Sequence, residues 1–436
     1  GRLHHGARVA IAGSDGPART MSTARRILIR YTLGNGAFFA VGALVFIGFS
    51  ILYTREFGIE RYGEFSFFLN TVTALISLGA YEGFLIAHSA TETRRDFDAF
   101  NRRFNPLNIV LILVAGVAFS VVSERIDPWV VLPIMAAIYL DYRSQSSIGV
   151  LITAADNWKI RAIRTVYQVL LVAIFLALQL AGLDIDHSFA AAALVAALTN
   201  YGLLLNSALA GLSKGAKQAV RSDVTARVLA IAIFTNLATV LTLLIDKFVI
   251  RQFDVGTDFG VGVYFLFFDL ATRVEALYLL VGVPVTNHLF NALKEGALPR
   301  REVSLMALAC AAAGLAFAIA GLVVVPWIYA VPLDGVALLP WLFGLYVAAR
   351  GVRFLVKAVC NAAGHHEALL LSNILVLAVA SALLVAMLAA GAGKLTIVAL
   401  AAIMAFAQLT RLPVLAWLLI SRHEGGRVTD ARGAAT

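Results

Sequence analysis

Twelve apolar runs, each long enough to form a membrane-spanning helix, occupy most of this 436-residue sequence. A helix needs about 20 residues to cross the hydrocarbon core, and it satisfies its own backbone hydrogen bonds there. The hydrophobic fraction of 60% and the charged fraction of 14% differ from the ~45 to 50% and ~25% of soluble domains. The sequence therefore predicts an all-α polytopic membrane protein with spans near residues 28–53, 65–90, 107–123, 129–153, 162–183, 188–211, 228–250, 261–288, 304–330, 336–358, 368–391 and 395–420.

Lysine and arginine are distributed unequally between the two sides of this arrangement. Short cytoplasmic loops hold an excess of these residues. When the tails are included, alternate connections here contain 23 on one side and 5 on the other. We therefore expect both termini to be cytoplasmic, and the outer side to hold only Arg55, Arg61, Arg125, Arg251 and Lys394.

The longest connection divides the spans into two sets of six. It contains Lys214, Lys217 and Arg221 and is typical of a cytoplasmic linker. Residues 1–20 begin without methionine, whereas Met21 opens a basic stretch before the first span, so residues 1–20 are a candidate non-native extension. The predicted organisation is two six-helix bundles around a central cavity: a tail at 1–24, a bundle at 25–212, a linker at 213–226, a bundle at 227–421 and a tail at 422–436.

A pattern at the end of the first span recurs at the end of the seventh. The first reads Arg-Glu-Phe at 55–57, a glycine turn to Gly63 and an aromatic helix start. The seventh reads Arg-Gln-Phe at 251–253, a glycine-rich turn to Gly262 and a second aromatic helix start. This repetition predicts that the two bundles are structural repeats, an arrangement common in transporters.

These segments carry a resemblance to a known family. The sequence F-G-I-E-R-Y-G-E-F-S at 57–66, followed by S-L-G-A-Y-E-G-F at 77–84, resembles the polysaccharide (O-antigen and capsule repeat-unit) flippases. Ile-Asp-Lys at 245–247 and Gly-Val-Tyr at 262–264 are similar to family features of the seventh span, although the turn at 254–260 is looser. The resemblance covers roughly residues 25 to 420 and places the chain in the multidrug/oligosaccharidyl-lipid/polysaccharide exporter superfamily.

Membership implies a non-enzymatic flippase. It would move polyprenyl-diphosphate-linked oligosaccharide repeat units across the bacterial cytoplasmic (inner) membrane by alternating access, for cell-surface polysaccharide biosynthesis. The implied partners are this lipid-linked glycan, membrane lipids, a proton or sodium ion, and a polysaccharide polymerase. Two alternatives stay open: an ion-coupled multidrug exporter of the same superfamily and, less favoured, a membrane polysaccharide polymerase. Nucleic acid is not expected, because the basic residues are dispersed between apolar runs.

Cations within the spans are the candidate substrate-binding residues. A charge in the hydrocarbon region costs about 2.5 to 3.5 kcal/mol and normally faces a cavity or a partner. Tyr346, Arg350, Arg353 and Lys357 have the spacing of one helix face, and arginine binds diphosphate oxygens bidentately. Alternatively, Arg353 and Lys357 extend to lipid phosphates at the membrane surface. The complete candidate set is Arg143, Lys247, Arg273, Arg350, Arg353, Lys357 and Arg411.

Acids within the spans are candidates for ion coupling, because a buried carboxylate can titrate or bind sodium. They are Glu82, Asp141, Asp246, Asp269 and Glu275. Each can equally balance a nearby cation, so proton coupling, sodium coupling and facilitated flipping stay open.

Spacing makes three further predictions about these charges. Asp269 and Arg273 are four residues apart with the acid first, which favours an intrahelical ion pair. Asp141 and Arg143 are two apart, so each needs a partner on another helix. Pro413 is expected to bend the last span near Arg411.

No cofactor or metal site is expected from the sequence. His-His-Glu at 365–367 lacks the H-E-x-x-H spacing of zinc enzymes. Cys310 and Cys360 lie within predicted spans without a C-x-x-C motif.

Overall fold

The computed structural model describes residues 17–80, 94–153, 157–212, 226–294, 300–363, 366–391 and 395–418. Within these ranges the chain forms twelve α-helices and one short 3-10 helix, which confirms the predicted all-α fold. In the first half these are α1 (Pro17–Phe57), α2 (Ile59–Ile76), η1 (Ser77–Ala80), α4 (Arg94–Ser123), α5 (Pro128–Thr153), α6 (Asn157–Leu180) and α7 (Ile185–Gly211). In the second half they are α8 (Ala226–Gln252), α9 (Asp258–Lys294), α10 (Arg300–Ile328), α11 (Leu339–Ala363), α12 (His366–Ala389) and α13 (Ile397–Leu409).

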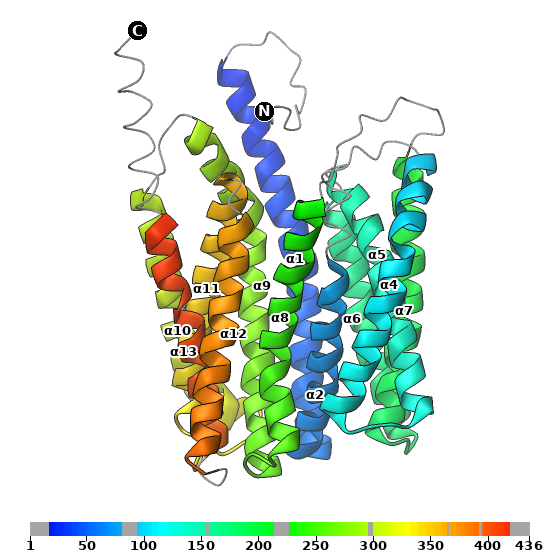
Figure 1. The fold of residues 1–436 in the computed structure, drawn as a ribbon, viewed down its shortest axis with the longest axis vertical. Helices are drawn as coiled ribbons and strands as arrows, with labels where there is room; N and C mark the ends of the chain where they lie inside the picture. The colour runs from blue at the N-terminus through cyan, green and yellow to red at the C-terminus, as the bar shows by residue number, and fades with distance from the viewer. Residues whose placement is uncertain are drawn as a thin grey trace.

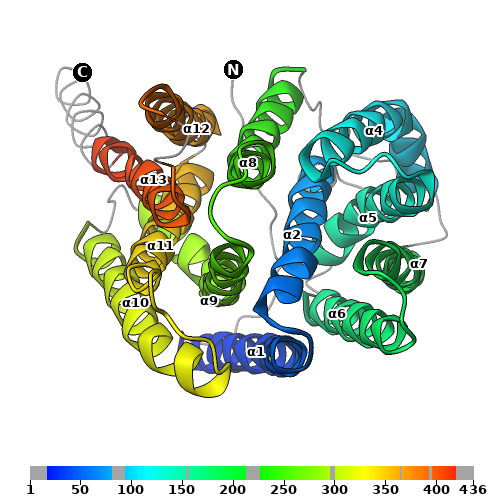
Figure 2. The same cartoon turned by 90° about the horizontal axis from the view of Figure 1, so that it is seen from below.

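The helices form two bundles that stand side by side (Figures 1 and 2). In the first, α5 and α6 pack against α7, and α1 packs against α6. In the second, α11 packs against α9, α10 and α13, while α12 packs against α8. The main contact between the bundles joins α2 to α9. Most of the predicted linker, at 213–225, lies outside the described residues.

Eight of the described helical segments are long and apolar enough to cross a membrane, judged by length and composition. They belong to α1, α4, α6, α7, α8, α10, α12 and the region from Ile397 to Leu418. The other four helices are α2, α5, α9 and α11, and the last three of them carry most of the candidate charged residues. Helices that hold intramembrane charge are expected to turn it toward the protein, so α5, α9 and α11 are the helices in which a site is expected.

Helix ends depart from the predicted spans for identifiable reasons. Helix α2 begins at Ile59 because Gly58, with φ of 92°, reverses the chain directly after α1; glycine adopts such left-handed backbone without steric strain. The last span is interrupted at Thr410, and the helix resumes at Arg411. Pro413 explains the interruption, since it has no N–H to donate to the carbonyl of Leu409.

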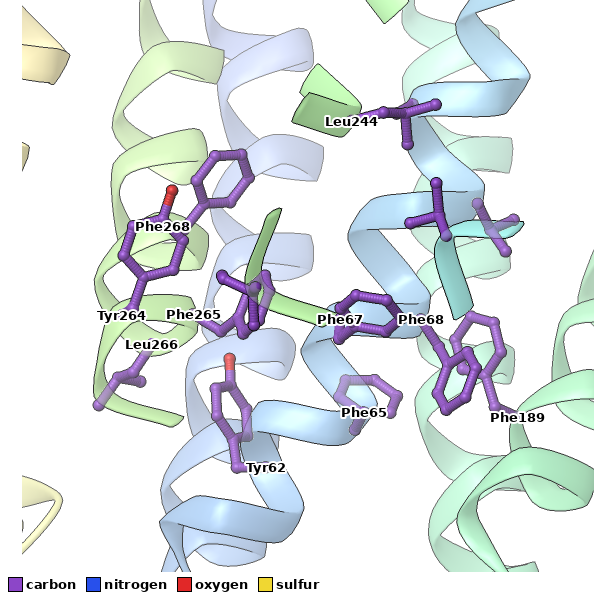
Figure 3. Packing of buried hydrophobic residues seen from close by; sticks show 14 of the residues in the cluster. Tyr62, Phe65, Phe67, Phe68, Phe189, Leu244, Tyr264, Phe265, Leu266 and Phe268 are labelled. Atoms are coloured by element: carbon purple, nitrogen blue, oxygen red, sulfur yellow. The ribbon is translucent and has the colours of Figure 1, made fainter. Parts of the chain in front are cut away.

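Aromatic side chains fill the region where the bundles meet (Figure 3). Phe67 on α2 and Phe265 on α9 contact edge to face, with ring centroids 5.9 Å apart. The next residue of α2, Phe68, stacks on Phe189 of α7, and their ring centroids are also 5.9 Å apart. Each of these four rings is at most 2% exposed, so the aromatic helix starts predicted from the repeat form part of the core.

Helices α2 and α9 cross with their backbones in direct contact at two glycines. A Cβ atom on Gly63 would lie 2.7 Å from the Cα atom of Gly262, and one on Gly262 would overlap the carbonyl oxygen of Ile59. Small residues permit this close approach between membrane helices. The crossing therefore requires glycine at both positions.

Corresponding positions of the two halves meet at this crossing. Gly63 contacts Gly262, and Asn70 hydrogen-bonds to Asp269; in both pairs the residue numbers differ by 199. A contact in which position i meets its own equivalent is the signature of a two-fold axis. This geometry is what the sequence repeat requires.

Candidate functional site

Three arginines and one glutamate gather inside the second bundle. Arg350 on α11 forms a bidentate ion pair with Glu275 on α9. Its Nε donates to Oε2 at 2.8 Å and its Nη2 donates to Oε1 at 2.7 Å. Arg353, one turn further along α11, has Nη1 at 3.9 Å from the same carboxylate. Glu275 therefore serves two arginines at once.

The third arginine, Arg411, joins this group through neutral side chains. Its Nη2 donates to Asn373 Oδ1 on α12 at 3.1 Å, and Asn373 donates in turn to Thr239 Oγ1 on α8 at 3.2 Å. Arg353 donates to the same Thr239 oxygen at 3.4 Å. We call Arg350, Arg353, Arg411 and Glu275 the arginine cluster.

The arginine cluster has more positive charge than its own acid can balance. Arg411 is 2% exposed, and its Nε and Nη1 atoms have no hydrogen-bond partner. Gln408, three residues before Arg411, is also buried, and its Oε1 atom has no hydrogen-bond partner either. An arginine is normally buried only with paired charge and satisfied donors, so Arg411 departs from this rule in both respects.

Exposure along α11 increases from the cluster toward its carboxyl end. Tyr346 and Arg350 are buried, Arg353 is partly exposed and Lys357 is exposed. Arg350, Arg353 and Lys357, with Tyr346 at the inner end, thus form a basic path. It runs between the interior of the second bundle and the end that we expect to be cytoplasmic. Lys357 lies at the position where extension to lipid phosphates is equally feasible.

Asp246 and Lys247, by contrast, form a closed unit. Both are fully buried, with Lys247 Nζ 3.1 Å from Asp246 Oδ1. Tyr264 donates to Asp246 Oδ2 at 2.6 Å, and the Lys247 ammonium lies 4.3 Å from the ring centroid of Phe268. Charge, hydrogen bonds and a cation–π contact satisfy the pair internally, so it presents nothing to a substrate in this conformation.

Asp269 connects the two bundles. Tyr62 and Ser66 on α2 both donate to its Oδ2 atom at 2.6 Å, and Asn70 Nδ2 donates to Oδ1 at 2.8 Å. The carboxylate is 2% exposed. Three charge-assisted hydrogen bonds from one helix therefore hold α2 against α9.

The predicted ion pair between Asp269 and Arg273 does not form. Asp269 is occupied by its α2 donors, whereas the Arg273 guanidinium carbon lies 3.8 Å from the ring centroid of Phe46 on α1. Spacing along a helix permits the pair, but better-placed partners on neighbouring helices take both members. Arg273 Nε has no hydrogen-bond partner, so this arginine adds a second under-satisfied cation near the contact between the bundles.

In the first bundle, Asp141 and Arg143 point to different neighbours, as their spacing predicts. Asp141 receives Arg164 of α6 bidentately, at 2.8 and 3.2 Å, so it acts as a charge partner. Arg143 points to α4, where its closest polar contact is the Asn101 carbonyl at 3.5 Å. Neither joins the arginine cluster, and the last candidate acid, Glu82, lies outside the described residues.

Several residues of these networks were not predicted. Thr239, Asn373 and Asn70 are neutral residues without a distinctive pattern in the sequence. Tyr62 and Ser66 lie in the segment 57–66 that carries the resemblance, but that segment does not indicate an acid partner for them. Arg164 lies at the start of the apolar run predicted near 162–183 and is counted among the 23 basic residues of the cytoplasmic side, yet α6 starts earlier, at Asn157. The unpaired Asp141 was the signal that a cation had to be found.

An acidic cavity of about 490 Å³ lies between the bundles, at the end where α1 joins α2. Gly63 and Val261 line it, which places it beside the glycine crossing. Two arginines, Arg61 and Arg251, are outnumbered there by acids: Glu60, Glu64, Glu124, Asp254 and Asp258. This cavity is therefore acidic, in contrast with the arginine cluster inside the second bundle.

No family model and no curated protein matches this chain by sequence. Solved structures do match in fold. The inward-facing conformation of a multidrug resistance MATE family transporter of the MOP superfamily superposes with a TM-score of 0.64 at 12% identity, covering 90% of this chain and 98% of the other. The chain has the fold of the MOP superfamily transporters.

Two further MOP-fold structures extend the comparison. The lipid II flippase MurJ in an inward closed conformation gives a TM-score of 0.61 at 12% identity, covering 90% of this chain and 87% of the other. The outward-facing conformation of a multidrug resistance MATE family transporter gives 0.57 at 12% identity, covering 91% and 96%. The likeness to the MOP fold does not reach the polysaccharide branch, which stays a prediction.

Proposed function

We propose that this chain translocates a polyprenyl-diphosphate-linked oligosaccharide across the cytoplasmic membrane by alternating access. The observation that carries the proposal is the arginine cluster, in which Arg350 and Arg353 share Glu275 and the buried Arg411 bonds only to a neutral amide. The fold of this chain is also that of the lipid II flippase MurJ, which supports a lipid-linked substrate. A diphosphate would supply the negative charge that Glu275 alone cannot provide for three arginines.

The basic path on α11 gives the diphosphate a route to this cluster. Lys357 and Arg353 would attract the substrate from the cytoplasmic end, and Arg411 would bind its oxygens through the two nitrogens that have no partner. Arg350 stays committed to Glu275 through two hydrogen bonds and positions that carboxylate. The sugar, which needs no hydrocarbon contact, would cross in the water between the bundles.

The charge of this cluster favours an anionic substrate over the alternative of a cationic drug. A multidrug exporter for cations would place excess carboxylates in its binding region, because like charges repel strongly in a low dielectric. Here the excess lies with arginine. The acidic cavity at the expected outer end would in turn repel a bound diphosphate and so promote its release.

The conformation described here supports an inward-facing state. The glycine crossing closes the end that we expect to be outer, and the TM-score is higher against an inward-facing than against an outward-facing MATE conformation. Opening the outer end would break the three hydrogen bonds to Asp269, which makes Asp269 our candidate for coupling to a proton or sodium ion.

Transport of a fluorescent polyprenyl-diphosphate glycan in proteoliposomes tests the proposal. Arg353→Ala and Arg411→Ala leave the Arg350–Glu275 pair intact, and each should reduce the initial rate at least tenfold, the loss expected for a charge-assisted contact of about 1.5 kcal/mol. Arg125→Ala is the matched control, since Arg125 pairs with Asp186 at the opposite end. Equal rates in all three variants would overturn the role of the cluster, as would efflux of cationic drugs by the wild type without glycan transfer.

A further inference from the structure

A second polar cavity, of about 540 Å³, lies in the first bundle between α4 and α5. Two arginines line it, Arg102 from α4 and Arg143 from α5, together with Asp98 and three neutral polar side chains. It belongs to a different bundle from the arginine cluster. None of its lining residues takes part in the contact between α2 and α9.

The cations of this cavity outnumber its one acid among the lining residues, Asp98, and do not pair with it. In the part of the chain that the structure describes, neither Arg102 nor Arg143 forms an ion pair, and Arg143 has only the 3.5 Å contact to the Asn101 carbonyl. Tyr139 is already engaged, donating to Asn105 Oδ1 at 3.0 Å. Guanidinium groups held in this way offer free donors to a phosphate.

Asn101 adds a second condition that a ligand of this cavity must meet, namely a hydrogen-bond donor. This side chain is 7% exposed, and its Oδ1 acceptor has no hydrogen-bond partner. A buried amide oxygen without a donor is unfavourable by about 1 to 3 kcal/mol. The cavity thus fits a ligand with two features: a phosphate for the arginines and a hydroxyl or ammonium donor for Asn101.

The surroundings of the cavity face lipid. Along α4, Ile109 and Leu113 follow one and two turns after Asn105 and are 47% and 57% exposed. Along α5, Leu132 lies two turns before Tyr139 and is 62% exposed. In a span, exposed apolar side chains contact acyl chains. Polar groups in the first turns of α4 therefore sit where head groups end and hydrocarbon begins.

We propose that the α4–α5 cavity binds the head group of a glycerophospholipid that carries both a phosphate and a hydroxyl or ammonium donor. The lipid belongs to the leaflet at the end where α4 begins, which we expect to be cytoplasmic. Basic pockets between membrane helices on that side are known to hold lipid head groups. This site is independent of the transported substrate and would anchor the first bundle while the second moves.

Lipid binding to the purified full-length chain in detergent tests the site. The probe is short-chain phosphatidylglycerol, and we expect Arg102→Gln and Arg143→Gln each to weaken its binding about fivefold, and the double variant about 25-fold. Arg103→Gln is the matched control, because Arg103 lies on the same turn but contacts the Phe104 ring at 5.7 Å. Elution as a single species shows that each variant is folded.

A second experiment tests whether the ligand must donate a hydrogen bond to Asn101, by comparing two lipids. Phosphatidylethanolamine and phosphatidylcholine have the same net charge, but only the first has N–H donors, so wild type should prefer it and Asn101→Leu should abolish the preference. Wild-type phosphatidylglycerol binding in the Arg102/Arg143 double variant would overturn the proposal. Inorganic phosphate competing as well as the lipid would also overturn it, by showing a free-phosphate site.

Discussion

Within the described residues, Glu275 is the only carboxylate that pairs with an arginine of the arginine cluster. It therefore determines how much positive charge of the cluster is left uncompensated. Removing one member of a buried ion pair leaves the other without compensation. Arg350 is 8% exposed and Glu275 21% exposed in their side chains, so water screens the pair only in part.

We therefore predict that Glu275→Gln destabilises the second bundle by about 3 kcal/mol. Cys310 and Cys360 are free and buried there, so a thiol-reactive fluorescent dye reports unfolding without any engineered label. The variant should react at a clearly lower temperature than wild type. Added inorganic diphosphate should restore part of the loss, because it replaces the missing negative charge; a variant as stable as wild type would contradict this account.

At this scale the sequence identifies charges but not their partners. Spacing showed that Asp141 and Arg143 could not pair with each other. In the structure Asp141 pairs with Arg164, and Arg143 lines the α4–α5 cavity. The same kind of rule was wrong for Asp269 and Arg273, because a helix-local rule ignores neighbours. Tyr62, Ser66 and Asn70 are 199 to 207 residues from Asp269 and can donate to it only after α2 and α9 have packed.

Among the elements, α2 and α9 depend most on residue size. The chain also contains helical glycines with open space around them: an added Cβ at Gly36, Gly48 or Gly202 would meet nothing within 4 Å. These provide controls for the crossing at Gly63 and Gly262, where an added Cβ meets backbone atoms.

Gly63→Ala and Gly262→Ala should each separate α2 from α9 and shift the protein toward an outward-open conformation. A single cysteine at Ser66, introduced after Cys310 and Cys360 are replaced, should become several-fold more reactive to a membrane-impermeant maleimide. Gly48→Ala should leave that reactivity unchanged. No difference between Gly63→Ala and Gly48→Ala would show that the crossing does not seal this end.

Elements could be predicted well where hydrophobicity decides them. Each apolar run corresponds to a helix, because a backbone in lipid has few alternatives. Their starts were predicted less well: α4 begins at Arg94, well before the apolar run near 107, since polar residues continue a helix beyond the hydrocarbon region. The glycine crossing could not be predicted, because glycine in a span signals close packing without naming the partner.

For the whole molecule, alternating access requires the α2–α9 contact to open during each cycle. Cysteines at positions 67 and 265, whose native rings contact across α2 and α9 with centroids 5.9 Å apart, can be joined by a short bifunctional methanethiosulfonate reagent. Cross-linking should stop transport and reduction should restore it. Cysteines at 144 and 200, which join α5 to α7 inside one bundle, are the control and should cross-link without loss of transport; loss in both pairs would contradict rigid-bundle movement.

The shared offset of 199 at the glycine crossing also concerns how symmetry limits an interface. In a contact between two identical copies on a two-fold axis, a position that meets its own equivalent carries the same residue on both sides, and two carboxylates there would repel each other. A single chain has no such restriction: Asn70 is the donor and Asp269 the acceptor at one pair of equivalent positions. The contact can therefore be a directional hydrogen bond, which identical side chains could not supply in the same way.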